Sequence, residues 1–232
     1  MKNNIQIEIC TGSLREVISA SAFAEVDRIE LNCALALGGL TPSLHTLKEA
    51  KRLSEKKIIA MVRVRAAGFL YEEHEKDLML KDAECFLQNG ADGIVFGCLN
   101  NDHDVDEPFT QKMCALIHSY GKEAVFHKAF DDARDLFEAA EALIRCRVDR
   151  VLTSGKAKDA LRGAQILQAL NRKYGNELSF LPGGGVNEDN VNRILEISEC
   201  AQIHMSAKST FVQDGEYYAV DPVKIRRILE KI

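Results

Sequence analysis

Residues 181–187 read Leu-Pro-Gly-Gly-Gly-Val-Asn and follow a short apolar run at 178–181. An amphipathic segment with Val191, Ile194 and Leu195 on one face comes next, so the stretch predicts a strand, a glycine loop and a helix. Three adjacent glycines leave backbone N–H groups uncovered beside a helix N-terminus, which suits a phosphate or a carboxylate. The alternative is a tight turn that only glycine can form.

The same strand–loop–helix unit recurs along the chain. Seven further strands are expected at residues 5–10, 28–32, 58–65, 93–97, 123–128, 150–155 and 202–206. Short strands that alternate with amphipathic helices predict a parallel sheet with helical crossovers. Eight such units predict a single (β/α)8 TIM barrel over residues 1–232. An open doubly wound sheet is the alternative, although no GxGxxG fingerprint follows the first strand.

Several helix starts are marked by capping residues. Ser13 opens a capping box before the first helix. Thr41 is a suitable N-cap, with Pro42 at the first helical position. Asp131 and Asp132 can cap the helix that follows the fifth strand.

Composition narrows the possible partners. The net charge is -5 and the 30 basic residues are scattered, so we expect no nucleic-acid partner. No apolar run approaches the length of a membrane span. Residues 1–4 lead straight into a strand pattern, so we expect no signal peptide. The 7 cysteines are odd in number and form no CxxC pair, which predicts reduced thiols in a cytoplasmic protein.

The ends of the predicted strands are unusually polar. They carry Glu8, Cys10, Glu30, Asn32, Arg63, Arg65, His127, Lys128, Asp131, His204 and Ser206. In a TIM barrel these C-terminal strand ends form the active-site mouth. Charged side chains are costly to bury unless they are paired, so the pattern predicts a solvent-accessible, functional mouth. The alternative is a neutralised network in which glutamates and arginines pair to fill the barrel.

Candidate catalytic roles follow from side-chain chemistry. Arg63 and Arg65 share one strand face, so both guanidinium groups could bind the same anion. His127 precedes Asp131 and suits acid–base chemistry, although it could also be a core histidine. Glu8 and Glu30, on adjacent strands, could be a general acid and base or salt-bridge partners of the arginines.

Candidate anion-binding groups gather after the last three strands. They are Thr153, Ser154 and Gly155, the loop residues Gly183, Gly184 and Gly185, and Ser206, which shares a strand face with His204. The loops after strands seven and eight hold the habitual phosphate site of this fold. For residues 153–155 a plain helix cap is the alternative.

Seven short motifs occur in an order typical of one family. They are RIEL at 28–31, GGLTPS at 38–43, RVR at 63–65, FHKAFD at 126–131, LTSG at 152–155, PGGGV at 182–186 and HMS at 204–206. Together they resemble the CutC family, named for copper homeostasis. The resemblance implies a cytoplasmic (β/α)8 barrel that is often dimeric, is linked to copper tolerance and binds copper.

Three departures from the family pattern concern the mouth. The family typically has proline between the two arginines, where this chain has Val64. Lys128 stands where the family has arginine, which keeps the positive charge but loses the guanidinium group and its paired hydrogen bonds. Asn32 occupies the position of a family cysteine, and Cys33 lies one residue on, turned away by strand parity. Cys10 therefore remains the candidate copper ligand.

Two hypotheses result. The first is a copper-binding protein that uses Cys10. The second is an enzyme for an anionic, possibly phosphorylated, small molecule, held by Arg63, Arg65, Lys128 and the glycine loop. In it Glu8, Glu30, His127 and Asp131 handle protons. The residues favour the second, because arginines and carboxylates are poor Cu(I) ligands.

Overall fold

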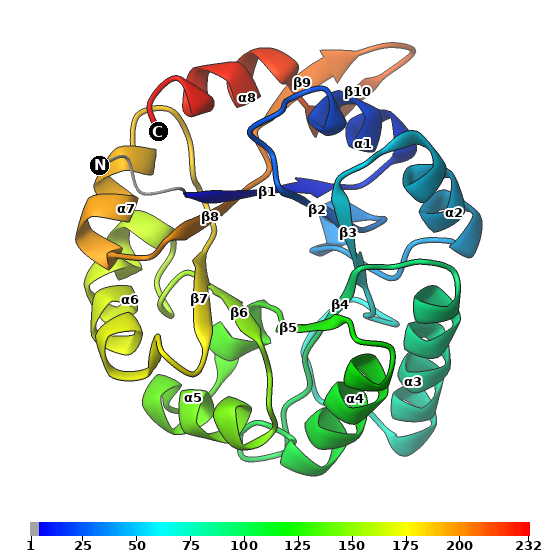
Figure 1. The fold of residues 1–232 in the computed structure, drawn as a ribbon, viewed down its shortest axis with the longest axis vertical. Coiled ribbons are helices and arrows are strands. Elements are labelled where there is room, and N and C mark those ends of the chain that lie inside the picture. The colour runs from blue at the N-terminus through cyan, green and yellow to red at the C-terminus, as the bar shows by residue number, and fades with distance from the viewer. Residues whose placement is uncertain (1–4) are drawn as a thin grey trace.

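Eight parallel strands form one sheet, in the order β7-β6-β5-β4-β3-β2-β1-β8. Their bounds are β1 Gln6–Thr11, β2 Arg28–Leu31, β3 Lys57–Met61, β4 Gly93–Phe96, β5 Glu123–Phe126, β6 Arg150–Thr153, β7 Ser179–Pro182 and β8 Gln202–Met205. A parallel bridge between Gly183 and His204 joins the two edges and closes the barrel (Figure 1). This computed structural model describes residues 5–232, so the expectation about residues 1–4 lies outside it. The predicted (β/α)8 TIM barrel is confirmed.

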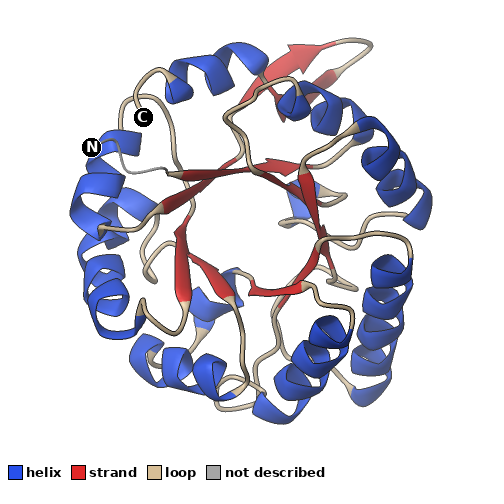
Figure 2. Ribbon diagram, in the orientation of Figure 1, coloured by secondary structure: helices blue, strands red, loops and turns tan. Residues whose placement is uncertain are grey.

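Helices surround the strands in an outer ring (Figure 2). Their bounds are α1 Leu14–Ser21, α2 Leu44–Leu53, α3 Glu73–Gln88, α4 Glu107–Ser119, α5 Leu136–Arg145, α6 Ala160–Tyr174, α7 Val191–Ser198 and α8 Pro222–Leu229. Two short 3-10 segments, η1 Leu35–Leu37 and η2 Lys128–Asp132, lie in the loops after β2 and β5. The apolar helix stripes pack against the outward strand residues, such as Ile9, Ile29 and Ile203, and form the main core. Within residues 5–232, no helix is both long and apolar enough to cross a membrane.

The interior of the barrel is divided between two kinds of side chain. A separate apolar cluster of Ile59, Met61, Val95 and Val125 comes from β3, β4 and β5. Buried polar and charged residues on β1, β2, β6 and β8 occupy most of the rest, beside Leu152 and Leu181. Strand register brings these polar residues together, because β1 pairs with β2 on one side and with β8 on the other. The functional candidates therefore lie on the polar side.

Two predicted helix caps are wrong. Ser43, not Thr41, caps α2, and the Thr41 hydroxyl instead accepts a hydrogen bond of 2.9 Å from the backbone N–H of Arg63. Asp135 caps α5, because η2 intervenes and the Asp131 carboxylate binds the start of the next loop. Strand β3 also ends at Met61, four residues before the predicted end.

A β-hairpin between β8 and α8 was not predicted. Strands β9 (Lys208–Val212) and β10 (Glu216–Val220) pair antiparallel. Asp214 and Gly215 at the tip both have positive φ, a conformation that these two residue types adopt more easily than most. Figure 1 shows the hairpin beside α1, at the outer ring of the barrel.

Candidate functional site

Glu8 lies at the centre of the polar interior, with only 1% of its surface exposed. It faces Arg28 on β2 and His204 on β8, its neighbours in strand register. Arg28 Nε donates to Glu8 Oε2 at 3.0 Å, and His204 Nδ1 lies 2.7 Å from Glu8 Oε1. The Glu8 carboxylate therefore pairs with one basic side chain from each neighbouring strand.

A second layer of polar side chains closes the barrel below Glu8. Arg28 also donates to Gln6 at 2.8 Å and to Gln202 at 3.1 Å. Arg150 donates to Gln202 and pairs with Glu123 through its Nε at 3.0 Å. Because every charge in this layer has a partner, it resembles the neutralised network that the sequence left open as an alternative.

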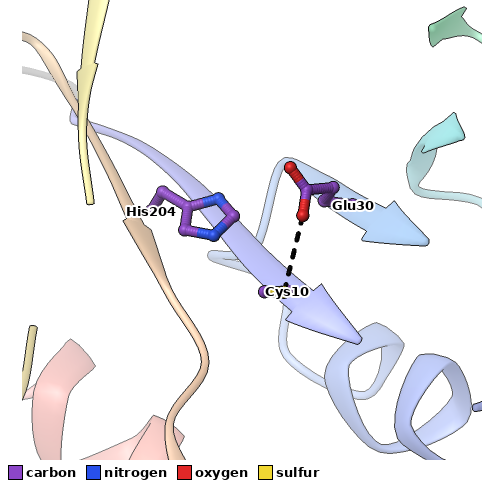
Figure 3. A group of neighbouring side chains, drawn as sticks. All are labelled: Cys10, Glu30 and His204. Carbon is purple, nitrogen blue, oxygen red and sulfur yellow. Dashed lines mark hydrogen bonds between the residues drawn. The ribbon is translucent and has the colours of Figure 1, made fainter. Parts of the chain in front are cut away.

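Cys10, Glu30 and Asn32 form a small cluster above Glu8. The Cys10 thiol donates to Glu30 Oε1 at 3.5 Å, and the Asn32 amide donates to the same oxygen at 2.8 Å. The possible ligand atoms of Cys10, Glu30 and His204 all lie within 4.8 Å of one another. Figure 3 shows these three side chains converging from β1, β2 and β8. The buried Oδ1 of Asn32 has no hydrogen-bond partner among the described residues.

The surroundings shift the pKa values of the two carboxylates in opposite directions. Burial alone would raise the pKa of Glu8, but the hydrogen bond from His204 and the charges of His204, Arg28 and Arg150 lower it to about 2. Burial and the nearby charge of Glu8 raise the pKa of Glu30, and this outweighs the opposing effect of His204. Glu8 is thus the fixed negative charge of the site, and Glu30 is the carboxyl group more easily protonated.

The cysteine and histidine respond to the same charges. Burial, with the adjacent carboxylate of Glu30, raises the pKa of the Cys10 thiol well above its usual value. Burial would lower the pKa of His204, but Glu30 and Glu8 together raise it. Without a bound ion, Cys10 is therefore a thiol and His204 favours its charged form.

His127 lies apart from this cluster, at the end of β5. Its Nδ1 accepts a hydrogen bond of 3.1 Å from the Ala129 N–H, which places the ring proton on Nε2. Burial and the charge of Arg63 lower the pKa of His127 to about 3, so the ring is neutral. The ring contacts Phe69 at a centroid distance of 4.8 Å, and its buried Nε2 has no partner within residues 5–232.

Arg63 and Arg65 do not converge on a common point. Arg63 is buried and donates to the carbonyl oxygens of Leu37, Gly39 and Ala67. Arg65 pairs with Glu75 at 2.6 Å. Strand parity no longer governs them, because the chain leaves β3 at Met61. Their guanidinium groups therefore stabilise the loops after β2 and β3.

Of the three residues after β6 that were predicted to bind an anion, Thr153 and Ser154 bind Asp131, and the Gly155 N–H donates to Thr153 Oγ1 at 2.8 Å. The Asp131 carboxylate accepts hydrogen bonds from the Thr153 hydroxyl at 2.5 Å, the Ser154 N–H and hydroxyl at 2.9 Å each, and the Lys156 N–H at 2.9 Å. The ammonium of Lys128 lies 3.2 Å from the same carboxylate. Asp131 thus occupies the anion position of this loop.

The glycine loop after β7 is a tightly bonded turn. Gly183 N–H donates to Thr153 O at 3.0 Å, and Gly184 O accepts from Ala160 N–H at 2.9 Å. Gly184 and Gly185 have φ of 109° and 68°, which only glycine adopts without strain. A Cβ at Gly184 would lie 3.4 Å from Lys128 Nζ, so the loop does approach that cation.

Ser206 lies elsewhere. It lines a cavity with Cys10 on the side of the β9–β10 hairpin, and the glycine loop does not line this cavity. Sequence reasoning missed this cavity, and it also missed the contact of Asn32 with Glu30. The strand alternation of Glu30 and Asn32 could have revealed that contact, because both positions face inward.

The sequence model of the CutC family matches residues 5–209. The chain belongs to the CutC family. A family protein CutC from Treponema denticola is 42% identical over 88% of this chain and 82% of its own length. A family protein CutC from Glaesserella parasuis is 37% identical over 98% of this chain and 99% of the relative.

Solved structures agree with this assignment. The CutC structure from Streptococcus agalactiae has a TM-score of 0.81 and 26% identity, and the match covers 87% of this chain and 98% of that chain. A deoxyribose phosphate aldolase from Aeropyrum pernix has a TM-score of 0.69 at 14% identity, with 98% of this chain and 90% of that chain covered. The second likeness shows the shared barrel fold alone.

Proposed function

We propose that this CutC-family chain binds a transition-metal ion, with copper as the candidate, through Cys10, Glu30 and His204. The observation that carries the proposal is the grouping of three ligand atoms within 4.8 Å. The name of the Streptococcus agalactiae relative refers to copper homeostasis, which is the reason to place copper first.

The donor set fits a metal ion in its chemistry. Imidazole suits copper and zinc, thiolate suits Cu(I) and zinc, and carboxylate favours divalent ions. The mixture of sulfur, nitrogen and oxygen therefore suits Cu(II) or zinc better than Cu(I). The hydrogen bond between Glu8 and His204 Nδ1 leaves Nε2 for an ion, which would displace the Nε2 proton, as carboxylate–histidine pairs do at metal sites. The unpartnered Oδ1 of Asn32 adds a polar atom beside the cluster.

A metal titration tests this proposal. We expect the metal-free protein to bind Cu(II) or zinc in competition with a chelator. Cys10→Ser, Glu30→Gln and His204→Gln should each weaken binding by at least about 10–100-fold, because each removes a ligand atom. Cys85→Ser, a half-buried cysteine outside the cluster, is the matched control. Equal affinity in wild type and Cys10→Ser would contradict the proposed site.

A second candidate function is acid–base catalysis on an anionic or phosphorylated small molecule. The opposite pKa shifts of Glu8 and Glu30 favour it, because such pairs separate acid and base roles. In this version Glu30 exchanges the proton, and Lys128, with 42% of its side chain exposed, meets the anion beside Gly184. Asp131, His127, Arg63 and Arg65 support the mouth around them.

Native mass spectrometry tests the second candidate. We expect a small acidic molecule to be retained by the purified protein and to be lost from Lys128→Gln, because this change removes a charge at the mouth. Lys48→Gln, on the exposed side of α2, is the control. Retention that does not differ between the two variants would count against this role.

The proposal also includes the cytoplasmic location and the homodimer that the family resemblance implies. Light scattering measures the oligomeric state.

A further inference from the structure

A cavity of about 560 Å³ lies between the β9–β10 hairpin, the start of α1 and η1. Its wall combines apolar and aromatic residues, including Leu35, Tyr217 and Tyr218. Cys10 and Ser206, from the ends of β1 and β8, also line it, so the cavity extends to the barrel mouth. This volume is in the range of small-molecule sites, which are roughly 300–1,000 Å³.

The cavity is bounded by elements that are bonded to one another. Glu16 on α1 accepts a hydrogen bond of 3.2 Å from Val220 N–H on β10, and it also accepts one from Gly12 N–H. Arg15 donates to the Tyr217 hydroxyl and lies over the Phe211 ring at 5.7 Å. The hairpin is therefore held against α1, and the space between them is a defined part of the fold.

Two cations at this cavity have no acidic partner. Within residues 5–232, Arg15 and Lys208 form no ion pair, and Lys208 lies over the Tyr218 ring at 5.5 Å. Glu16 also lines the cavity, but both of its oxygens accept backbone N–H groups and it is 4% exposed. Glu216 also lines the cavity, but it is exposed near the hairpin tip, where it pairs with Val212. The exposed rim of the cavity therefore has positive charge beside aromatic rings.

We propose that this cavity binds a small organic anion with a flat, apolar body, such as an aromatic carboxylate. The ring would lie against Tyr217 and Leu35, and the carboxylate would face Arg15. Both contacts follow from the preference of arginine for carboxylates and of cations and rings for one another. The inference goes beyond the proposed metal site, with which it shares Cys10, and it does not require a bound ion.

Calorimetry on metal-free protein tests the inference with naphthalene-2-carboxylate and its neutral amide as probes. We expect the carboxylate to bind more tightly than the amide. Arg15→Gln should weaken carboxylate binding about tenfold, because a charge-assisted hydrogen bond is lost. Tyr217→Ala should weaken both probes, while Val212→Ser, at a hairpin side chain that is 77% exposed, should change neither. Failure of both probes to bind, or equal binding to wild type and Arg15→Gln, would overturn the proposal.

One further variant separates this inference from the proposed metal site. Glu30→Gln removes a proposed metal ligand that does not line the cavity. We expect this variant to lose metal affinity and to retain naphthalene-2-carboxylate binding. Loss of carboxylate binding in folded Glu30→Gln would overturn the proposal that the cavity binds the anion independently, whatever the metal titration shows.

Discussion

Replacement of Glu8 by glutamine is expected to lower the free energy of unfolding by about 3–5 kcal/mol, the usual cost of breaking a buried ion pair. The change leaves Arg28 buried without its carboxylate and removes the charge that faces His204 Nδ1. Both partners are almost fully buried, so water cannot replace the lost interaction. Urea denaturation of Glu8→Gln and wild type at neutral pH measures the difference.

The pH dependence of stability checks the same group. The pKa of Glu8 is lowered to about 2 in the folded protein, below its ordinary value of 4.5. Its contribution is therefore fully present above pH 4.5 and is lost as the pH falls toward 2. The free energy of unfolding of Glu8→Gln should therefore fall less steeply than that of wild type between pH 4.5 and pH 2. Glu49→Gln, at an exposed pair with Arg52, is the matched control and should behave as wild type. Equal stability of Glu8→Gln and wild type would contradict the central role of Glu8.

Replacement of Asp131 by alanine is expected to lower the free energy of unfolding by about 3 kcal/mol or more, since each buried donor left unpaired costs about 1–3 kcal/mol. The hydroxyl of Thr153 and the N–H of Ser154 would lose their acceptor, whereas the Ser154 hydroxyl could still donate to Ala157 O. Thermal unfolding measures the loss. The adjacent Asp132→Ala is the control, because its side chain is exposed.

The Asp131→Ala protein should also respond to added formate. Removal of the carboxylate leaves a space lined by N–H and hydroxyl donors beside Lys128, which suits a small anion. We expect formate to raise the melting temperature of Asp131→Ala more than that of wild type or Asp132→Ala. An equal response of all three proteins would show that the donors do not form an anion site.

The barrel and the polar half of its interior could be predicted from residue periodicity. The alternation of Gln6, Glu8 and Cys10 places them on one face, and parallel pairing then brings Glu8 to Arg28 and His204. The partners of these residues are set by the order of neighbouring strands, which the fold determines once eight units are recognised.

The loops could not be predicted in this way, because they have no repeat that fixes side-chain direction. Arg65 pairs with Glu75 instead of sharing an anion with Arg63, since β3 ends before either arginine. Asp131 looked like a helix cap, yet it binds the loop at Ser154. The β9–β10 hairpin depends on a turn at 214–215, whose signal is only two residues long.

The contact between Glu8 and His204 joins residues that are 196 positions apart in the chain. A nascent chain that has left the ribosome only as far as β7 contains Cys10 and Glu30 but not His204. Its first strand also lacks one of its two neighbours until β8 arrives. Any chemistry that needs all three side chains must therefore wait until β8, the last strand of the barrel, has been synthesised.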